Sequence, residues 1–166
     1  MRVHIDQGAT SAVLWDYLLT EHPATPLQRV DIGIAALGSG TAQRALRAFE
    51  SVLFYRDGDA VDQAGSLALE VIARRGIALY HTRTGRDEQA VMVYTDLVDT
   101  FGDSEDPDVA EQVAQALLGI GLTFAKLGSN GQAVSAYTEL VERYQDHPSP
   151  SMSAFVAKAL LGQATT

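Results

Sequence analysis

Residues 114–146, AQALLGIGLTFAKLGSNGQAVSAYTELVERYQD, decide the fold of this chain. Apolar residues recur at intervals of three and four on both sides of Gly128, which is the pattern of two amphipathic helices joined by a tight turn. The apolar stripe of the second helix consists of Ala133, Val134, Tyr137, Leu140 and Val141. The stretch therefore predicts an antiparallel helical hairpin.

The rest of the chain has the same character. Prolines and glycines separate amphipathic segments, for example at 10–22, where Pro23 follows, and at 41–56, where Thr41 is the expected N-cap. No segment shows the period-two alternation of a half-buried strand. Alanine, leucine and valine dominate the apolar residues, and many glycines fall inside apolar runs, which favours close packing of helix on helix. We expect an all-α protein with about seven helices.

The hairpin pattern occurs three times. A shift of 43 residues places Gly85 on Gly128 and Tyr94 on Tyr137, and a third copy lies further upstream. Four kinds of position recur: a small residue in the first helix, a turn glycine, a small residue in the second helix, and an aromatic four residues later. In chain order they are Gly33, Ala78 and Gly121; Gly40, Gly85 and Gly128; Ala45, Ala90 and Ala133; and Phe49, Tyr94 and Tyr137.

On these positions the chain resembles a tetratricopeptide repeat protein. The resemblance implies a right-handed α-solenoid of antiparallel helix pairs, in which each pair packs on the next. The chain departs from the family pattern at Arg29, Arg74 and Leu117, where an aromatic residue is usual early in the first helix. Its repeats also exceed the usual length of about 34 residues, so we predict a long variant of about 43 residues.

The repeat also divides the chain, which at 166 residues has the length of one domain. We expect residues 1–166 to form a single tetratricopeptide-like domain. Its predicted parts are an N-terminal helix (1–25), repeat 1 (26–57), repeat 2 (71–102), repeat 3 (114–145) and a C-terminal partial repeat or capping helix (150–166).

Composition excludes several classes of function. The net charge of −9 gives no gain from counterion release on a polyanion, so we expect neither nucleic-acid nor acidic-membrane binding. Cysteine is absent, which excludes disulfides and thiolate chemistry. No apolar run is long enough to span a membrane, and the first residues lack the apolar core of a signal peptide. We predict a cytoplasmic protein.

The resemblance implies that a protein or peptide binds on the concave face, which the first helix of each pair lines. The lysine, asparagine and arginine clamp of the family's best-known variant is absent here, because those positions hold apolar residues, glycine and glutamine. The alternative is that the apolar residues are simply core between neighbouring helices. The candidate groove residues are Val30, Ile34, Arg75, Leu79, Arg83, Leu118, Leu122 and Lys126.

Catalytic and metal sites find little support in the sequence. The acidic loop between Asp99 and Asp108 lacks the spacing of a calcium-binding loop. The four histidines are far apart and share no helical face, and no nucleophile or acid–base arrangement is recognisable. We therefore predict a non-enzyme without a metal or cofactor.

The two ends of the chain leave a second function open. Residues 10–22 resemble a second helix without its first, and residues 149–164 resemble a first helix without its second. Such terminal helices expose apolar side chains, here Phe155, Leu160 and Leu161. The primary expectation is a scaffold for a protein segment. The alternative is a homo-oligomerising or regulatory repeat module of a larger signalling protein or enzyme.

Overall fold

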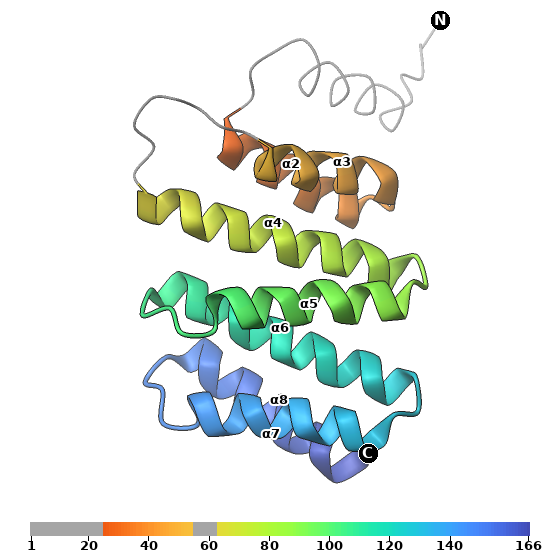
Figure 1. Ribbon diagram of the computed structural model, residues 1–166, viewed down its shortest axis with the longest axis vertical. Coiled ribbons are helices and arrows are strands. Elements are labelled where there is room, and N and C mark those ends of the chain that lie inside the picture. The colour runs from red at the N-terminus through yellow and green to blue at the C-terminus, as the bar shows by residue number, and fades with distance from the viewer. Residues whose placement is uncertain (1–24, 55–62) are drawn as a thin grey trace, which may run out of the picture.

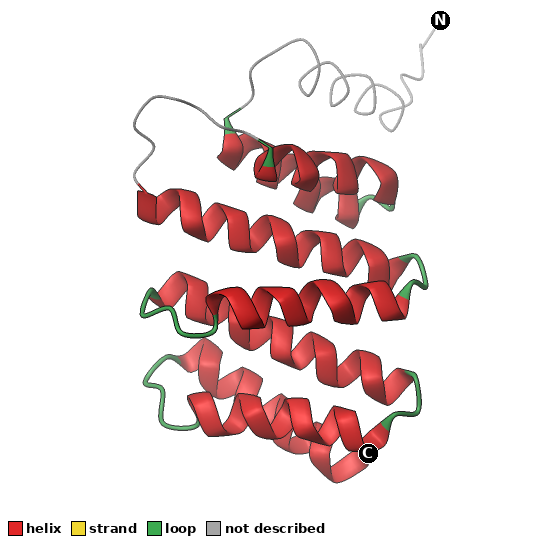
Figure 2. Cartoon of the chain, viewed as in Figure 1, coloured by secondary structure: helices red, strands yellow, loops and turns green. Residues whose placement is uncertain are grey.

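The computed structural model describes residues 25–54 and 63–166, which form seven α-helices and no strand (Figure 2). The helices are α2 (Pro26–Gly38), α3 (Ala42–Leu53), α4 (Gln63–Arg83), α5 (Asp87–Phe101), α6 (Pro107–Lys126), α7 (Asn130–Tyr144) and α8 (Pro150–Thr165). The helix predicted at 10–22 lies outside the described residues.

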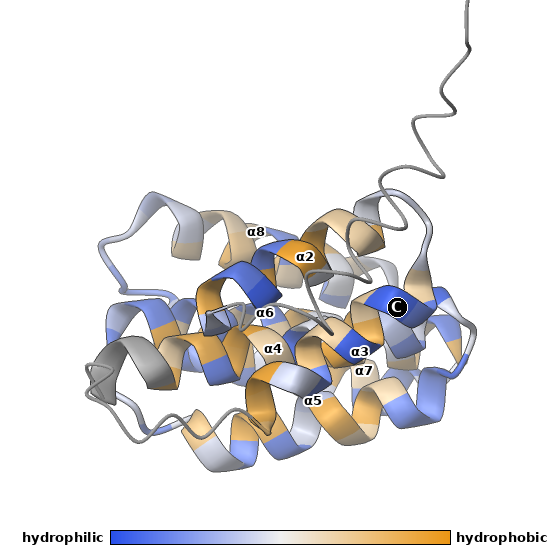
Figure 3. Cartoon of the chain, turned by 90° about the horizontal axis from the view of Figure 1, so that it is seen from above, coloured by the Kyte–Doolittle hydropathy of each residue, from blue (hydrophilic) through white to orange (hydrophobic). Residues whose placement is uncertain are grey.

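The helices stack in chain order along the long axis of the molecule (Figure 1). Each packs on its neighbours in the sequence, and α2, α4, α6 and α8, which we call the A helices, also contact one another in succession. Within the described part of the chain, the B helices α3, α5 and α7 pack more closely on A helices than on each other. The view along the stack accordingly places A helices on one side and B helices on the other (Figure 3). This arrangement confirms the predicted all-α repeat solenoid.

Local sequence signals start the A helices. Thr25 and Gln28 form a capping box at α2, with the Thr25 amide 2.9 Å from Gln28 Oε1. Asp106 caps α6 by accepting a hydrogen bond from the Asp108 amide at 2.9 Å. Proline follows at the first position of each of these helices, where its missing N–H has no helical partner to lose.

Each A helix that leads into a B helix is followed, two residues after its end, by a glycine with positive φ. Gly85 and Gly128 both have φ of 72°, and Gly40 has φ of 76°. The amide after each glycine donates back across the turn, as from Ser129 to Phe124 O at 2.9 Å. This is the Schellman arrangement, which satisfies the last helical carbonyls and needs a left-handed residue. The three turns therefore have one geometry.

Thr41 occupies the predicted N-cap position of α3, but only its backbone carbonyl serves that helix. Its side chain makes no cap bond at α3, and Thr41 Oγ1 instead donates to Ala36 O at 3.2 Å. Its amide also donates to Ala36 O, so the hydroxyl and the amide of Thr41 both satisfy a carbonyl at the end of α2. The helix itself ends at Leu53, short of the expected residue 56.

An aromatic ring from each B helix joins successive A helices. The ring of Phe49 lies between Gly33 of α2 and Gly76 of α4, and a Cβ built at either glycine would come within 2.5 Å of it. The equivalent rings are Tyr94, which packs against Gly119, and Tyr137, which lies between Gly121 and Gly162. Small residues thus let the A helices pack closely on each ring. This close packing sets the distance between neighbouring A helices.

Candidate binding groove

Two adjoining hollows lie along the A helices. One, of about 410 Å³, is lined by residues of α4, α5, α6 and α8 between Arg75 and Lys158. The other, also about 410 Å³, continues towards the end of α8. They share Leu118, Leu122 and Lys158. We call the two together the helix-A groove.

The floor of the helix-A groove is apolar and set by the repeat. Tyr94 is buried beneath it because Gly119 has no side chain, and a Cβ there would lie 2.8 Å from the ring. Leu118 is also buried, whereas Leu122, one turn further along α6, is 57% exposed. Since Leu122 borders both hollows, it presents an apolar side chain at the junction between them.

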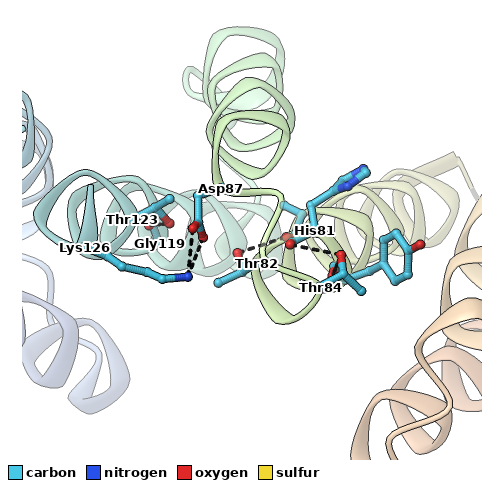
Figure 4. A network of polar contacts seen from close by, with 9 residues as sticks. His81, Thr82, Thr84, Asp87, Gly119, Thr123 and Lys126 are labelled. Carbon is cyan, nitrogen blue, oxygen red and sulfur yellow. Dashed lines mark hydrogen bonds and ion pairs between the residues drawn. The ribbon is translucent and has the colours of Figure 1, made fainter. Parts of the chain in front are cut away.

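Three cationic side chains border this floor. Lys126 Nζ lies 2.9 Å from Oδ1 of Asp87, the first residue of α5 (Figure 4). Lys158 Nζ lies 5.8 Å from the centre of the Phe155 ring, within the range of a cation–π contact.

Arg75 is the third of these cations. It donates from Nε to Gln112 Oε1 at 2.7 Å and is half-buried. Burial lowers the pKa of Arg75, and the neighbouring Tyr94 and Glu111 oppose that change. The guanidinium still carries its charge, because the ordinary pKa of arginine lies far above neutral pH. Arg75 therefore brings a positive charge into a partly desolvated position.

The structure brings together most of the residues that the sequence proposed for this face. Those in the helix-A groove are Arg75, Leu79, Leu118, Leu122 and Lys126. Val30 is 3% exposed and packs in the core between α2, α3 and α4. Ile34 is exposed on α2, outside both hollows. Arg83 donates from Nη1 to Leu37 O at 2.7 Å and so caps the end of α2.

Among the groove residues that the sequence reasoning missed are Phe155 and Lys158. Both lie on α8, which was treated as a terminal helix with uncovered apolar residues. The signal was present, because a shift of 43 residues places Lys158 on Gln115, a groove position of α6. The repeat therefore identifies the face of α8 that borders the groove.

The described residues offer little for other kinds of site. Within residues 25–54 and 63–166, no three side chains of histidine, aspartate or glutamate gather closely enough to hold a metal ion. None of the helices in those ranges has the length and apolar character needed to cross a bilayer.

Comparison with known proteins gives one match. Residues 115–147 match the family model described as tetratricopeptide repeat. The matched segment covers α7 and most of α6, which is the hairpin around Gly128. No curated protein and no solved structure matches the chain.

Proposed function

We propose that this chain, of which residues 115–147 match the tetratricopeptide repeat family, is a non-catalytic scaffold that binds a protein segment along the helix-A groove. Repeats of this family generally mediate protein–protein interaction, and stacked repeats present extended concave surfaces for that purpose. A cytoplasmic location is part of the same proposal and rests on the sequence alone.

The observation that carries the proposal is the position of Leu122. A leucine exposed to 57% gains by being covered, at roughly 25 cal/mol for each Å² of apolar surface removed from water. Its surroundings are two hollows with a buried apolar floor and a rim that contains Arg75, Lys126 and Lys158. An apolar centre with polar groups at its edge is the usual anatomy of a protein interface.

A matched pair of variants tests this role. Leu122→Gln removes the apolar side chain from the groove, and Met92→Gln makes a similar change at an exposed position of α5 outside both hollows. Both keep a good helix former. In a pull-down from lysate of the source cells, we expect wild type and Met92→Gln to retain the same partners and Leu122→Gln to lose them. Equal retention by all three, with unchanged circular dichroism melts, would contradict the groove proposal.

One observation favours the alternative of a homo-oligomer. Leu160 and Leu161 of α8 are 49% and 66% exposed and adjacent in sequence. A second copy of the chain that covers them would make mass depend on concentration. Light scattering over a hundredfold range of concentration tests this. A constant monomer mass contradicts the alternative, and a dimer that Leu160→Gln with Leu161→Gln dissociates supports it.

A further inference from the structure

The helix-A groove differs in charge from the chain as a whole. The chain has 21 acidic and 12 basic residues, with a net charge of −9. Yet the lining of the hollow between α4, α5, α6 and α8 contains Arg75, Lys126 and Lys158 and no carboxylate. A local excess of positive charge on an acidic protein favours an occupant of the opposite sign.

Two carboxylates that contact groove residues, Asp87 and Glu111, already have partners. Asp87 is paired with Lys126, whose Nζ lies 2.8 Å from Oδ2. Glu111 accepts hydrogen bonds from Gln115 Nε2 at 3.2 Å and from Ser151 Oγ at 2.9 Å. Neither is among the groove-lining residues. The positive charge of the lining is therefore only partly offset from within the chain, by Asp87 at Lys126 and by the nearby charge of Glu111 at Arg75.

Arg75 and Lys158 keep donors for a ligand. In the described part of the chain, Arg75 uses Nε for Gln112, while Nη1 and Nη2 make no hydrogen bond and are not sealed from solvent. Lys158 contacts the Phe155 ring and pairs with no carboxylate of residues 25–54 and 63–166. A carboxylate that reaches Arg75 meets a planar pair of N–H groups, which is the geometry of bidentate pairing.

From this arrangement we propose that the occupant is an acidic protein segment in which a bulky apolar residue lies next to aspartate or glutamate. The apolar side chain covers Leu122, and the flanking carboxylates pair with Arg75 and Lys158. This inference rests on the proposed function, and it adds the chemistry of the partner.

The groove explains why the partner needs both an apolar side chain and a neighbouring carboxylate. Covering Leu122 alone would accept any apolar side chain, so it gives affinity without selecting a sequence. Pairing with a half-buried arginine requires a carboxylate, and an amine in the same place would be repelled by Arg75 and Lys158. Acidic and apolar groups together thus satisfy the site, and neither does so alone.

A random twelve-residue peptide library displayed on phage tests the proposal with the full chain as bait. We expect the enriched peptides to have a net negative charge and an aspartate or glutamate adjacent to leucine, isoleucine or phenylalanine. The most enriched peptide is then synthesised and its Kd measured by fluorescence anisotropy. Added salt should weaken its binding, because charge pairs at a partly exposed groove are screened.

Substitutions of the basic groove residues test where the peptide binds. We expect Lys158→Gln and Arg75→Gln each to weaken the Kd by roughly tenfold, the effect of losing one charge-assisted hydrogen bond. Arg143→Gln, on α7 and outside both hollows, is the matched control and should change the Kd by less than about twofold. Lys158 is exposed, so its replacement tests the proposal even where Arg75→Gln fails to fold.

The outcomes separate the two proposals. Peptides that are neutral or basic but lose binding in Leu122→Gln would overturn the acidic partner and leave the scaffold function standing. Acidic peptides indifferent to Arg75→Gln and Lys158→Gln would also overturn it. If no enriched peptide depends on Leu122, both the acidic partner and the groove function are wrong.

Discussion

Lys126 of α6 holds the carboxylate of Asp87 in a two-point contact, with Nζ 2.9 Å from Oδ1 and 2.8 Å from Oδ2. Asp87 is the first residue of α5 and is 8% exposed, so the pair fixes the start of one B helix to the end of the next A helix. The carboxylate also lies where the helix dipole favours an anion.

Loss of the lysine should destabilise the fold, because it leaves a nearly buried carboxylate without its partner. We expect Lys126→Met to lower the free energy of unfolding by about 1–2 kcal/mol, a value held down by the exposure of the lysine. The control is Glu139→Gln, which breaks the exposed i,i+4 pair with Arg143 and should cost less than about 0.5 kcal/mol. Urea denaturation measures both. An equal effect of the two substitutions would show that the contact with Asp87 stabilises the fold no more than an exposed ion pair does.

A side chain at Gly121 should disrupt the contact between α6 and α7. A Cβ there would overlap the ring of Tyr137, which is itself buried. We expect Gly121→Ala to cost about 2–3 kcal/mol through overpacking, despite the better helix propensity of alanine. Gly131→Ala in α7 meets nothing within 4 Å and should leave stability unchanged or slightly higher. Thermal melts of the two variants give the comparison, and similar melting temperatures would refute the steric argument.

Substitution of a turn glycine should destabilise the fold for a different reason. Gly128 has space around it but a φ of 72°, so a side chain strains the backbone without a clash. We expect Gly128→Ala to cost about 1 kcal/mol and Gly128→Asn to cost less, because asparagine tolerates the left-handed region. Chemical denaturation distinguishes them. If alanine proved as stable as asparagine, backbone strain would not explain the glycine.

His81 should make stability depend on pH. Its Nδ1 is buried without a hydrogen-bond partner in the described residues, and burial, followed by the charge of Arg86, lowers the pKa of His81 against a smaller opposing effect of Glu50. The unfolded state therefore binds a proton first as pH falls. The stability that neutral His81 contributes is complete above its ordinary pKa of 6.5 and is lost as pH falls through the lowered folded value. Urea titrations between pH 7.5 and 5.5 should show this loss in wild type and a flatter profile in His81→Gln. Parallel profiles would exclude His81 as the cause.

The repeat made the fold predictable from sequence. The turn glycines Gly40, Gly85 and Gly128 were predicted from the repeat, and in the structure each lies just after the end of an A helix. Thr41 is at the predicted N-cap position, but its side chain does not cap α3, because the preceding Schellman turn takes its amide and hydroxyl. That competition depends on geometry that the residue type does not show.

The groove was predictable only in part. Periodicity placed Leu118, Leu122 and Lys126 on one face of α6, where the structure has them lining a hollow. It placed Val30 on the equivalent face of α2, but Val30 turns into the core with Phe49. The pairing of Arg75 with Gln112 joins residues 37 apart and depends on how α4 crosses α6. Side-chain partners across helices follow from packing, which one sequence does not specify.

The rings held between A helices determine where this chain can be shortened. Tyr137 belongs to α7 but is covered on one side by Gly162 of α8, so the hairpin 107–144 does not enclose its own aromatic residue. A shortened form that stops after a B helix uncovers that ring, whereas one that stops after an A helix keeps it enclosed. The natural cutting point is therefore displaced by one helix from the repeat boundary, and grafting or duplicating a unit of this protein should transfer the stretch from one A-helix glycine to the next.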